Sequence, residues 1–177
     1  REMVDAYTAF VNKGIKVDPL YVTRIEDNKG NVISTFTPQY TEIISEETSH
    51  KMLEMLKAVI NEGTGVRLRY RYQFKGDIGG KTGTTQNNSD GWFIGVTPEL
   101  VSGTWVGGED RSIHFDNLRE GQGASMALPV WALYMQKVYA DETLGYSDTL
   151  KFDIPEHLHK EYKECVSQAP VEDLLFN

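Results

Sequence analysis

The sequence predicts an α/β (α+β) fold in which an antiparallel sheet is flanked by helices. Three β-rich runs follow one another closely between residues 77 and 106, a spacing that only antiparallel neighbours can accommodate. Helical periodicity appears on either side of them, over residues 45–62 and 124–139. With 177 residues the chain can bury one core of ordinary domain size, and we expect a single one.

The composition excludes several classes of protein. With 40% hydrophobic and 25% charged residues the chain is globular, and its net charge of −8 argues against nucleic-acid binding. Nine acidic and three basic residues lie after position 140, so we expect a nearly neutral body, residues 1–140, and an acidic tail, residues 141–177. The single Cys165 and four scattered histidines predict no disulfide, no metal and no cofactor. No apolar run reaches the roughly 18 residues that span a bilayer.

The first quarter of the chain predicts a helix and a hairpin. Apolar residues recur at helical spacing between Met3 and Val11, and Gly14 suits the left-handed position after a helix end. Residues 21–26 and 31–36 are β-rich and flank a glycine-containing turn. We therefore expect a short amphipathic helix followed by a two-stranded hairpin.

The helix over residues 45–62 has signals at both ends. Ser45 is a suitable N-cap, Glu46 and Glu47 suit the first turn, and Gly63 marks the end. We expect its buried face to consist of the apolar residues at helical spacing, which are Met52, Met55, Leu56, Val59 and Ile60.

Residues 66–72 alternate between basic and apolar side chains. The period of two predicts an extended segment with one basic face, formed by Arg67, Arg69 and Arg71. This face has two interpretations: the solvated side of a strand, or a strip beside a cleft that binds anions or a polymer.

The sheet is predicted from residues 77–85, 91–96 and 100–106. Residues 124–139 are apolar on nearly every side, which predicts a helix buried under that sheet, with Pro129 in its first turn or at a kink. Beyond Asp141 only short apolar patches such as residues 174–176 occur, so we expect no second core there.

The sequence Gly-Gly-Lys-Thr-Gly-Thr-Thr at residues 79–85 is the most informative motif of the chain, and it has two functional interpretations. A phosphate-binding P-loop requires a glycine where Lys75 stands, which makes nucleotide binding the weaker interpretation. The stronger one is the Lys-Thr-Gly element of serine acyltransferases. In such an element an ammonium attracts the substrate carboxylate, a hydroxyl donates to it, and glycine leaves room for substrate along the strand.

The surrounding residues strengthen this interpretation. Residues 80–85, 90–95 and 103–108, in that order and spacing, resemble the transpeptidase domain of penicillin-binding proteins. The Trp-Val-Gly-Gly-Glu-Asp stretch, the Ala-Leu-Pro-Val-Trp segment at residues 127–131 and the helix of residues 6–14 are most similar to the bifunctional class A members. The resemblance covers roughly residues 1–140 and implies a penicillin-binding-protein/β-lactamase-like transpeptidase fold that is incomplete here.

The resemblance also implies roles for the residues of this element. Lys81 would supply charge and hydrogen bonds to the catalytic serines, and the Thr82 and Thr84 hydroxyls would hold the carboxylate of the donor peptide. The Thr84 N–H would be an oxyanion donor. The predicted substrate-binding residues also include Gly80, Gly83 and Thr85.

Asp90, Trp92 and Phe93 match the family pattern too, but strand geometry and core packing already explain these residue types, so we predict structural roles for them.

Two further elements of the family, Ser-x-x-Lys and Ser-x-Asn, begin at none of the serines in residues 1–177. The nearest mimic, Thr48-x-x-Lys51, is better explained by capping of a helix. Nucleophilic catalysis needs a serine and its base within hydrogen-bond reach. We therefore expect the C-terminal part of a transpeptidase domain, inactive on its own; a catalytically dead homologue is less favoured because the Lys-Thr-Gly strand is intact.

The predicted parent protein is a peptidoglycan D,D-transpeptidase that cross-links stem peptides through an acyl-enzyme, binds β-lactams at the same serine, and carries a glycosyltransferase domain. It would be anchored in the bacterial cell envelope with this domain outside the cytoplasmic membrane. The alternatives are a serine β-lactamase or its sensor relative, and a non-catalytic module that binds envelope polymer through Arg67, Arg69 and Arg71.

The family's sheet has five strands, and the first two precede the sequence seen here. The strand of residues 100–106 should therefore have an unpaired edge, which favours self-association.

Overall fold

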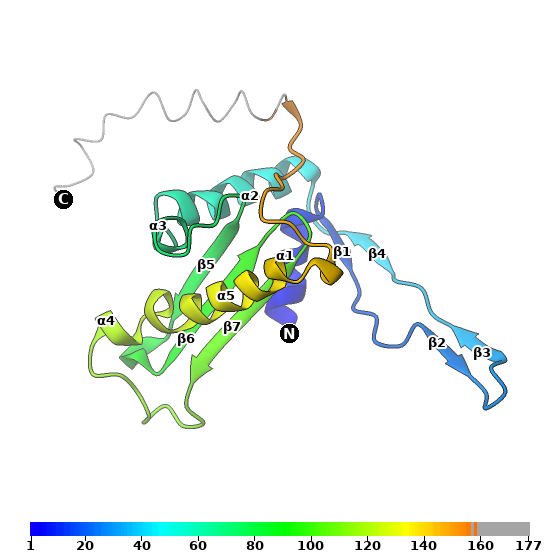
Figure 1. Ribbon diagram of the computed structural model, residues 1–177, viewed down its shortest axis with the longest axis horizontal. Coiled ribbons are helices and arrows are strands. Elements are labelled where there is room, and N and C mark those ends of the chain that lie inside the picture. Colours follow the sequence, from blue (N-terminus) through cyan, green and yellow to red (C-terminus); the bar gives the residue numbers. More distant parts are fainter. Residues whose placement is uncertain (157, 159–177) are drawn as a thin grey trace.

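The structure is a computed structural model and describes residues 1–156 and 158. It consists of a three-stranded sheet with helices packed around it and a two-stranded arm that extends away from this body (Figure 1). The expectations for Cys165 and for residues 174–176 lie outside the described residues.

The central sheet confirms the prediction of three antiparallel strands. It is formed by β5 (Gly79–Thr84), β6 (Asp90–Val96) and β7 (Val101–Gly107), in that spatial order. The register places Thr82 opposite Phe93. Among the strands that the structure describes, β5 and β7 each pair only with β6, so each has one edge without a strand partner.

Helices cover both faces of this sheet (Figure 1). On one face lies α5 (Gly123–Ala140), whose Trp131 ring occupies the space where a Cβ at Gly95 would be. On the other face lies α1 (Glu2–Val11), which packs against β6 and β7. The predicted helix of residues 124–139 is confirmed, with its first residue one position earlier.

Two details refine the expectation for α5. Pro129 lies inside the helix, so its expected place in the first turn is wrong, and a kink at Pro129 stays a prediction. The helix is not buried on all sides, because Val130, Leu133 and Tyr134 on its outer side are about half exposed. A single sheet can cover only one side of a helix, and no other described element covers the outer side of α5.

The predicted helix of residues 45–62 is α2 (Glu46–Asn61), and the Ser45 hydroxyl accepts a hydrogen bond from the Thr48 N–H at 3.2 Å. The helix runs along the β5 side of the sheet (Figure 1). Its Leu53 and Leu56 pack with Val96 on the face opposite α5, and Ile60 joins the core on the α5 side. Its buried apolar residues are Leu53, Leu56 and Ile60, whereas Met55, predicted on the buried face, is 55% exposed.

The core lies between α5, the sheet and the end of α2. Phe93 and Trp131 are fully buried at its centre, with ring centroids 5.2 Å apart in an edge-to-face arrangement. Other members of the cluster are Ile60, Leu68, Phe74, Ile78, Ala127, Leu128, Ala132 and Met135.

The segment of residues 66–72 is not a strand, and that prediction is wrong. Residues Arg67–Tyr70 form a single helical turn, α3, with Leu68 fully buried. The guanidinium of Arg67 donates to Ala124 O at 2.9 Å, and that of Arg69 donates to Phe74 O at 3.0 Å. Because these arginines satisfy backbone carbonyls, the basic face that the alternation predicted does not form.

The arm contains the predicted hairpin, with β2 (Arg24–Glu26) paired to β3 (Val32–Thr35). At its base, β1 (Ile15–Val17) pairs with β4 (Tyr40–Glu42), which the sequence did not predict. Gly30 in the turn has a φ of +84°, where glycine is favoured. The arm exposes many large apolar side chains, namely Leu20, Tyr21, Val22, Ile25, Val32, Ile33, Phe36 and Tyr40.

Three short elements complete the description. They are η1 (Gln86–Asn88) between β5 and β6, α4 (Leu118–Gly121) before α5, and η2 (Glu142–Leu144) after it.

The first part of the predicted acidic tail returns to the body. The Asp77 N–H donates to Leu150 O at 2.9 Å, and the Phe152 N–H donates to the Asp77 carboxylate at 3.2 Å. The division of the chain at residue 140 stays a prediction.

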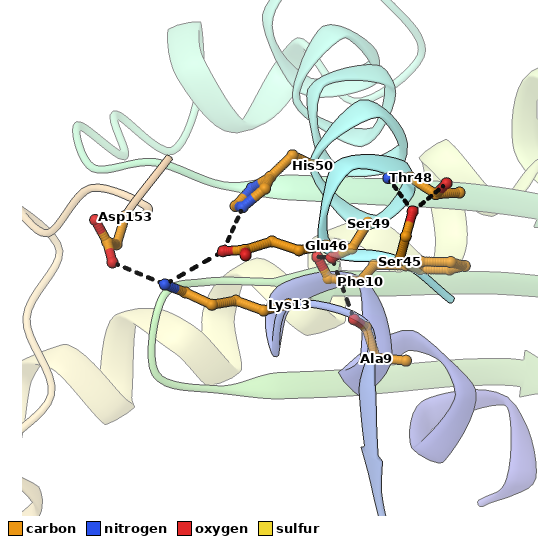
Figure 2. A network of polar contacts seen from close by, with 9 residues as sticks. All are labelled: Ala9, Phe10, Lys13, Ser45, Glu46, Thr48, Ser49, His50 and Asp153. Atoms are coloured by element: carbon orange, nitrogen blue, oxygen red, sulfur yellow. Dashed lines mark hydrogen bonds and ion pairs between the residues drawn. The ribbon is translucent and has the colours of Figure 1, made fainter. Parts of the chain in front are cut away.

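A polar cluster joins this returning segment to α1 and α2. Lys13 Nζ lies between two carboxylates, 3.3 Å from Asp153 and 3.5 Å from Glu46, and the buried His50 ring lies 3.5 Å from Glu46 (Figure 2). The hydrogen bond from Lys13 to Asp153, and then the charge of that carboxylate, raise the pKa of Lys13. The cluster therefore places Asp153 next to the turn that follows α1.

Candidate functional site

The Lys-Thr-Gly element occupies β5, on the side of the sheet that no described strand extends. Its two leading glycines are buried, and packing explains both. A Cβ at Gly79 would lie 2.9 Å from the Val96 side chain, and one at Gly80 would lie 2.8 Å from the Phe93 ring. Close packing of β5 on its neighbours thus requires glycine at these positions.

Successive side chains of β5 point to opposite faces of the sheet. Lys81 and Gly83 belong to the face that carries Trp92, which lies opposite Gly83 in the register. Lys81 is exposed, and its Nζ donates to Thr82 O at 2.7 Å. A flexible cationic side chain therefore stands at the surface next to the strand edge.

Thr82 and Thr84 belong to the other face, and each hydroxyl has a partner from a different segment. Thr82 Oγ1 lies 2.9 Å from Thr64 Oγ1, in the turn between α2 and α3. Thr84 Oγ1 accepts a hydrogen bond at 3.0 Å from the N–H of Gly123, the first residue of α5. The structure thus brings Lys81, Thr82 and Thr84 together on one strand, with both hydroxyls held.

The Thr85 hydroxyl contacts the start of β6, and substrate binding by Thr85 stays a prediction. It accepts from the Asp90 N–H at 2.9 Å and lies 3.1 Å from the Asp90 carboxylate. The same carboxylate accepts from Trp105 Nε1 at 3.0 Å. These contacts link the ends of β5, β6 and β7 and agree with a structural role for Asp90.

Of the other two residues predicted to be structural, Phe93 is fully buried, which confirms core packing. Trp92 is 37% exposed and lies on the Lys81 face of β6, so strand geometry rather than core packing accounts for this residue. Its neighbour across the register, Trp105, is 46% exposed.

Sequence reasoning missed Thr64 and Gly123. They lie 18 and 39 positions from their threonine partners, and neither forms a recognisable motif with them. Only the close packing of the α2–α3 turn and the α5 N-terminus around β5 reveals the two contacts.

Within residues 1–156 and at 158, no three His, Cys, Asp or Glu side chains lie close enough together to hold a metal ion. None of the helices described is both long and apolar enough to traverse a bilayer.

Comparison with known proteins identifies what this arrangement is similar to. The family model described as the penicillin binding protein transpeptidase domain matches residues 1–107. Penicillin-binding protein 1A of Aquifex aeolicus is 32% identical over 137 residues, which are 77% of this chain and 18% of that protein. Penicillin-binding protein 4 of Bacillus subtilis is 31% identical over 138 residues, 78% of this chain and 21% of that protein.

Solved structures of proteins with transpeptidase domains are similar to this chain in fold. Penicillin-binding protein 1A from Haemophilus influenzae has a TM-score of 0.70 at 27% identity, covering 80% of this chain and 26% of that one. The D,D-transpeptidase domain of a peptidoglycan glycosyltransferase from Eggerthella lenta has a TM-score of 0.54 at 25% identity, covering 77% and 32%. The chain spans about a fifth of the length of the curated relatives described above.

Proposed function

The chain belongs to the penicillin-binding protein transpeptidase family, and on that premise we propose that it supplies the carboxylate-binding side of the active site in a peptidoglycan D,D-transpeptidase. The observation that carries this proposal is the pair of held hydroxyls, Thr82 and Thr84, on a strand edge where the Lys81 ammonium lies 2.7 Å from the carbonyl oxygen of Thr82. Hydroxyl donors beside a cation are suited to a terminal carboxylate.

In the proposed reaction this strand binds the donor stem peptide. The Thr82 and Thr84 hydroxyls donate to the carboxylate of the terminal D-Ala, and Lys81 contributes positive charge and hydrogen bonds to the catalytic serines. The Thr84 N–H faces the oxygen that becomes negative in the tetrahedral intermediate. Glycine at position 83 leaves space for the peptide along the strand.

The nucleophile would come from a serine outside residues 1–177. It attacks the penultimate D-Ala carbonyl, the bond to the terminal D-Ala breaks, and the acyl group passes to the amine of a neighbouring stem peptide. β-Lactams acylate the same serine. Residues 1–177 alone would then neither turn over substrate nor bind penicillin covalently.

The parent protein is proposed to lie in the bacterial cell envelope, anchored in the membrane with this domain outside the cytoplasm. A glycosyltransferase domain in the same polypeptide is part of the proposal. The similarity to a transpeptidase domain of a peptidoglycan glycosyltransferase supports it.

Labelling with a fluorescent penicillin tests the proposed function. In the full-length polypeptide, Thr84→Val should slow acylation by about ten- to hundredfold, because a hydrogen bond to a charged group contributes about 1.5–3 kcal/mol. Thr41→Val, an exposed threonine on β4 in the arm, is the matched control and should label at the unsubstituted rate. Equal labelling of both variants, or labelling of residues 1–177 alone, would contradict the proposal.

We also propose that β7 associates with another strand through its open edge. In the described residues its Val101–Gly107 backbone pairs on one side only, and unpaired edges attract further strands. Light scattering of residues 1–177 at increasing concentration should reveal dimers or larger species. A strictly monomeric protein at high concentration would contradict association through the β7 edge.

A further inference from the structure

Both threonine hydroxyls of β5 can bind a carboxylate only if they point a proton outward. A hydroxyl has one proton and two acceptor lone pairs. For Thr84 the direction is set, because Oγ1 accepts from the Gly123 N–H and an N–H can only donate. The Thr84 proton is thus left to donate to a ligand.

For Thr82 the partner is another hydroxyl. Within the described part of the chain, the hydrogen-bond partner of Thr82 Oγ1 is Thr64 Oγ1 at 2.9 Å. Either oxygen could act as donor in this pair. If Thr82 donates to Thr64, its proton is used; if Thr64 donates to Thr82, the Thr82 proton is left for an anion.

We propose that Thr64 is a positioning residue of the active site, whose hydroxyl donates to Thr82 so that Thr82 can donate to the substrate carboxylate. A carboxylate brought to β5 favours this direction, because an anion accepts hydrogen bonds and cannot donate them. Donation from Thr64 also polarises the Thr82 hydroxyl and strengthens its bond to the anion.

The backbone around Thr64 is fixed tightly enough for such a role. The Gly65 N–H donates to Val59 O at 2.9 Å, and the Val66 N–H donates to Gly63 O at 3.1 Å. Gly65 is buried, and a Cβ there would meet the Ile60 side chain. The turn that carries Thr64 therefore packs directly on the end of α2.

A second contact joins this turn to the helix that holds Thr84. Arg67 Nη1 donates to the carbonyl oxygen of Ala124 at 2.9 Å, in the first turn of α5. A Cβ at Gly123 would collide with the carbonyl oxygens of Gly83 and Trp92, so α5 begins in direct contact with the sheet. The supports of the two hydroxyls thus form one connected unit around β5.

Because this inference rests on the proposed function, its test separates the two. In the full-length polypeptide, the second-order rate constant of acylation by a fluorescent penicillin is measured for Thr64→Val, Thr64→Ser, Thr82→Val and the double variant Thr64→Val/Thr82→Val. Circular dichroism and thermal unfolding confirm that each variant is folded. Thr64→Ala serves as a second deletion of the hydroxyl if the valine disturbs the turn.

Thr64→Val should lower the rate constant by about three- to tenfold, the usual range for one hydrogen bond. Thr64→Ser should stay within about twofold of the unsubstituted protein, because it keeps the hydroxyl. The double variant should be no slower than Thr82→Val alone, since Thr64 acts only through Thr82. A purely structural role of Thr64 would instead slow the double variant further.

Two results would overturn the inference alone, with Thr82→Val still slow: a Thr64→Val variant as fast as the unsubstituted protein, or losses that multiply in the double variant. If Thr82→Val itself acylates at the unsubstituted rate, the proposed function fails, and the role of Thr64 fails with it.

Discussion

The sheet that carries the site and the arm that leaves the body are both built from antiparallel strands, yet they are stabilised in opposite ways. In β5–β7 the backbones and helices approach so closely that Gly79, Gly80 and Gly95 have no room for a Cβ. In the arm, the residues of β2 and β3 are exposed except for Ser34, which is half-buried. The strand that carries the Lys-Thr-Gly element is thus supported by close packing on its neighbours. The arm depends instead on hydrogen bonds within its turn.

The contrast has a physical basis. A two-stranded ribbon is only marginally stable in water unless it packs against something. Here the turn supplies part of the stability, because the Asp27 carboxylate accepts hydrogen bonds from the N–H groups of Lys29 and Asn31. The hydrogen bond from the Asn31 side chain, followed by those of the backbone donors, lowers the pKa of Asp27. The sheet is instead stabilised by burial around Trp131.

The largest effect should come from emptying the core beneath the sheet. Trp131→Ala removes a fully buried ring that packs on Phe93 and should lower the free energy of unfolding by about 3–5 kcal/mol. Ile33→Ala in β3, where the side chain is 68% exposed, should change it by less than about 0.5 kcal/mol. Urea unfolding followed by circular dichroism measures both. Similar losses would show that the arm is part of the same cooperative core.

A pair of glycine substitutions sharpens the comparison. Gly123→Ala places a methyl group against the backbone of β5 and should cost about 1–3 kcal/mol through displacement of α5. Gly30→Ala meets no atom within 4 Å, and its cost of about 1 kcal/mol comes only from the left-handed backbone at φ +84°.

Amide hydrogen exchange separates the two glycine variants. Gly123→Ala should accelerate exchange in α5 and β5, and Gly30→Ala should accelerate it only in β2 and β3. Faster exchange in β5 with Gly30→Ala would contradict the independence of arm and sheet.

Several elements could be predicted from local pattern alone. The three sheet strands and α2 have strong local signals, and Ser45 caps α2 as expected. The alternation over residues 66–72 misled because a short window cannot distinguish a strand from one helical turn when the arginines bind carbonyls. Helix α5 was predicted to be buried under the sheet, but its apolar pattern did not reveal that its outer side is exposed, since sequence does not say which faces other elements cover.

The residues of the candidate site also fall into two groups, those that a local motif reveals and those that only folding brings together. Lys81, Thr82 and Thr84 follow one another along the chain, so their motif was visible in the sequence. Thr64 and Gly123 reach them only through folding, and no spacing rule connects an isolated threonine or glycine to a strand so far away.

The smallest expected effect is the pH dependence of stability that comes from Tyr139. This residue lies in the last turn of α5, and its ring packs on Phe74. Burial raises the pKa of Tyr139 to about 12, above its ordinary value of 10. Because the folded-state pKa is the higher one, its contribution to stability is complete below pH 10 and is lost as pH rises towards 12.

Tyr139→Phe tests this dependence, because phenylalanine keeps the ring contact with Phe74 and cannot ionise. The unsubstituted protein should lose more unfolding free energy between pH 10 and pH 12 than the variant does, as measured by urea unfolding at each pH. Parallel profiles would show that Tyr139 is not buried as the structure describes.

The most direct test of the central claim is a crystal structure of the full-length polypeptide acylated by a penicillin. We expect the β-lactam carboxylate within hydrogen-bond distance of Thr82 Oγ1 and Thr84 Oγ1, with Thr64 Oγ1 still bonded to Thr82. A carboxylate bound away from β5, for example by Arg71, would contradict the assignment of this strand as the carboxylate-binding side of the site.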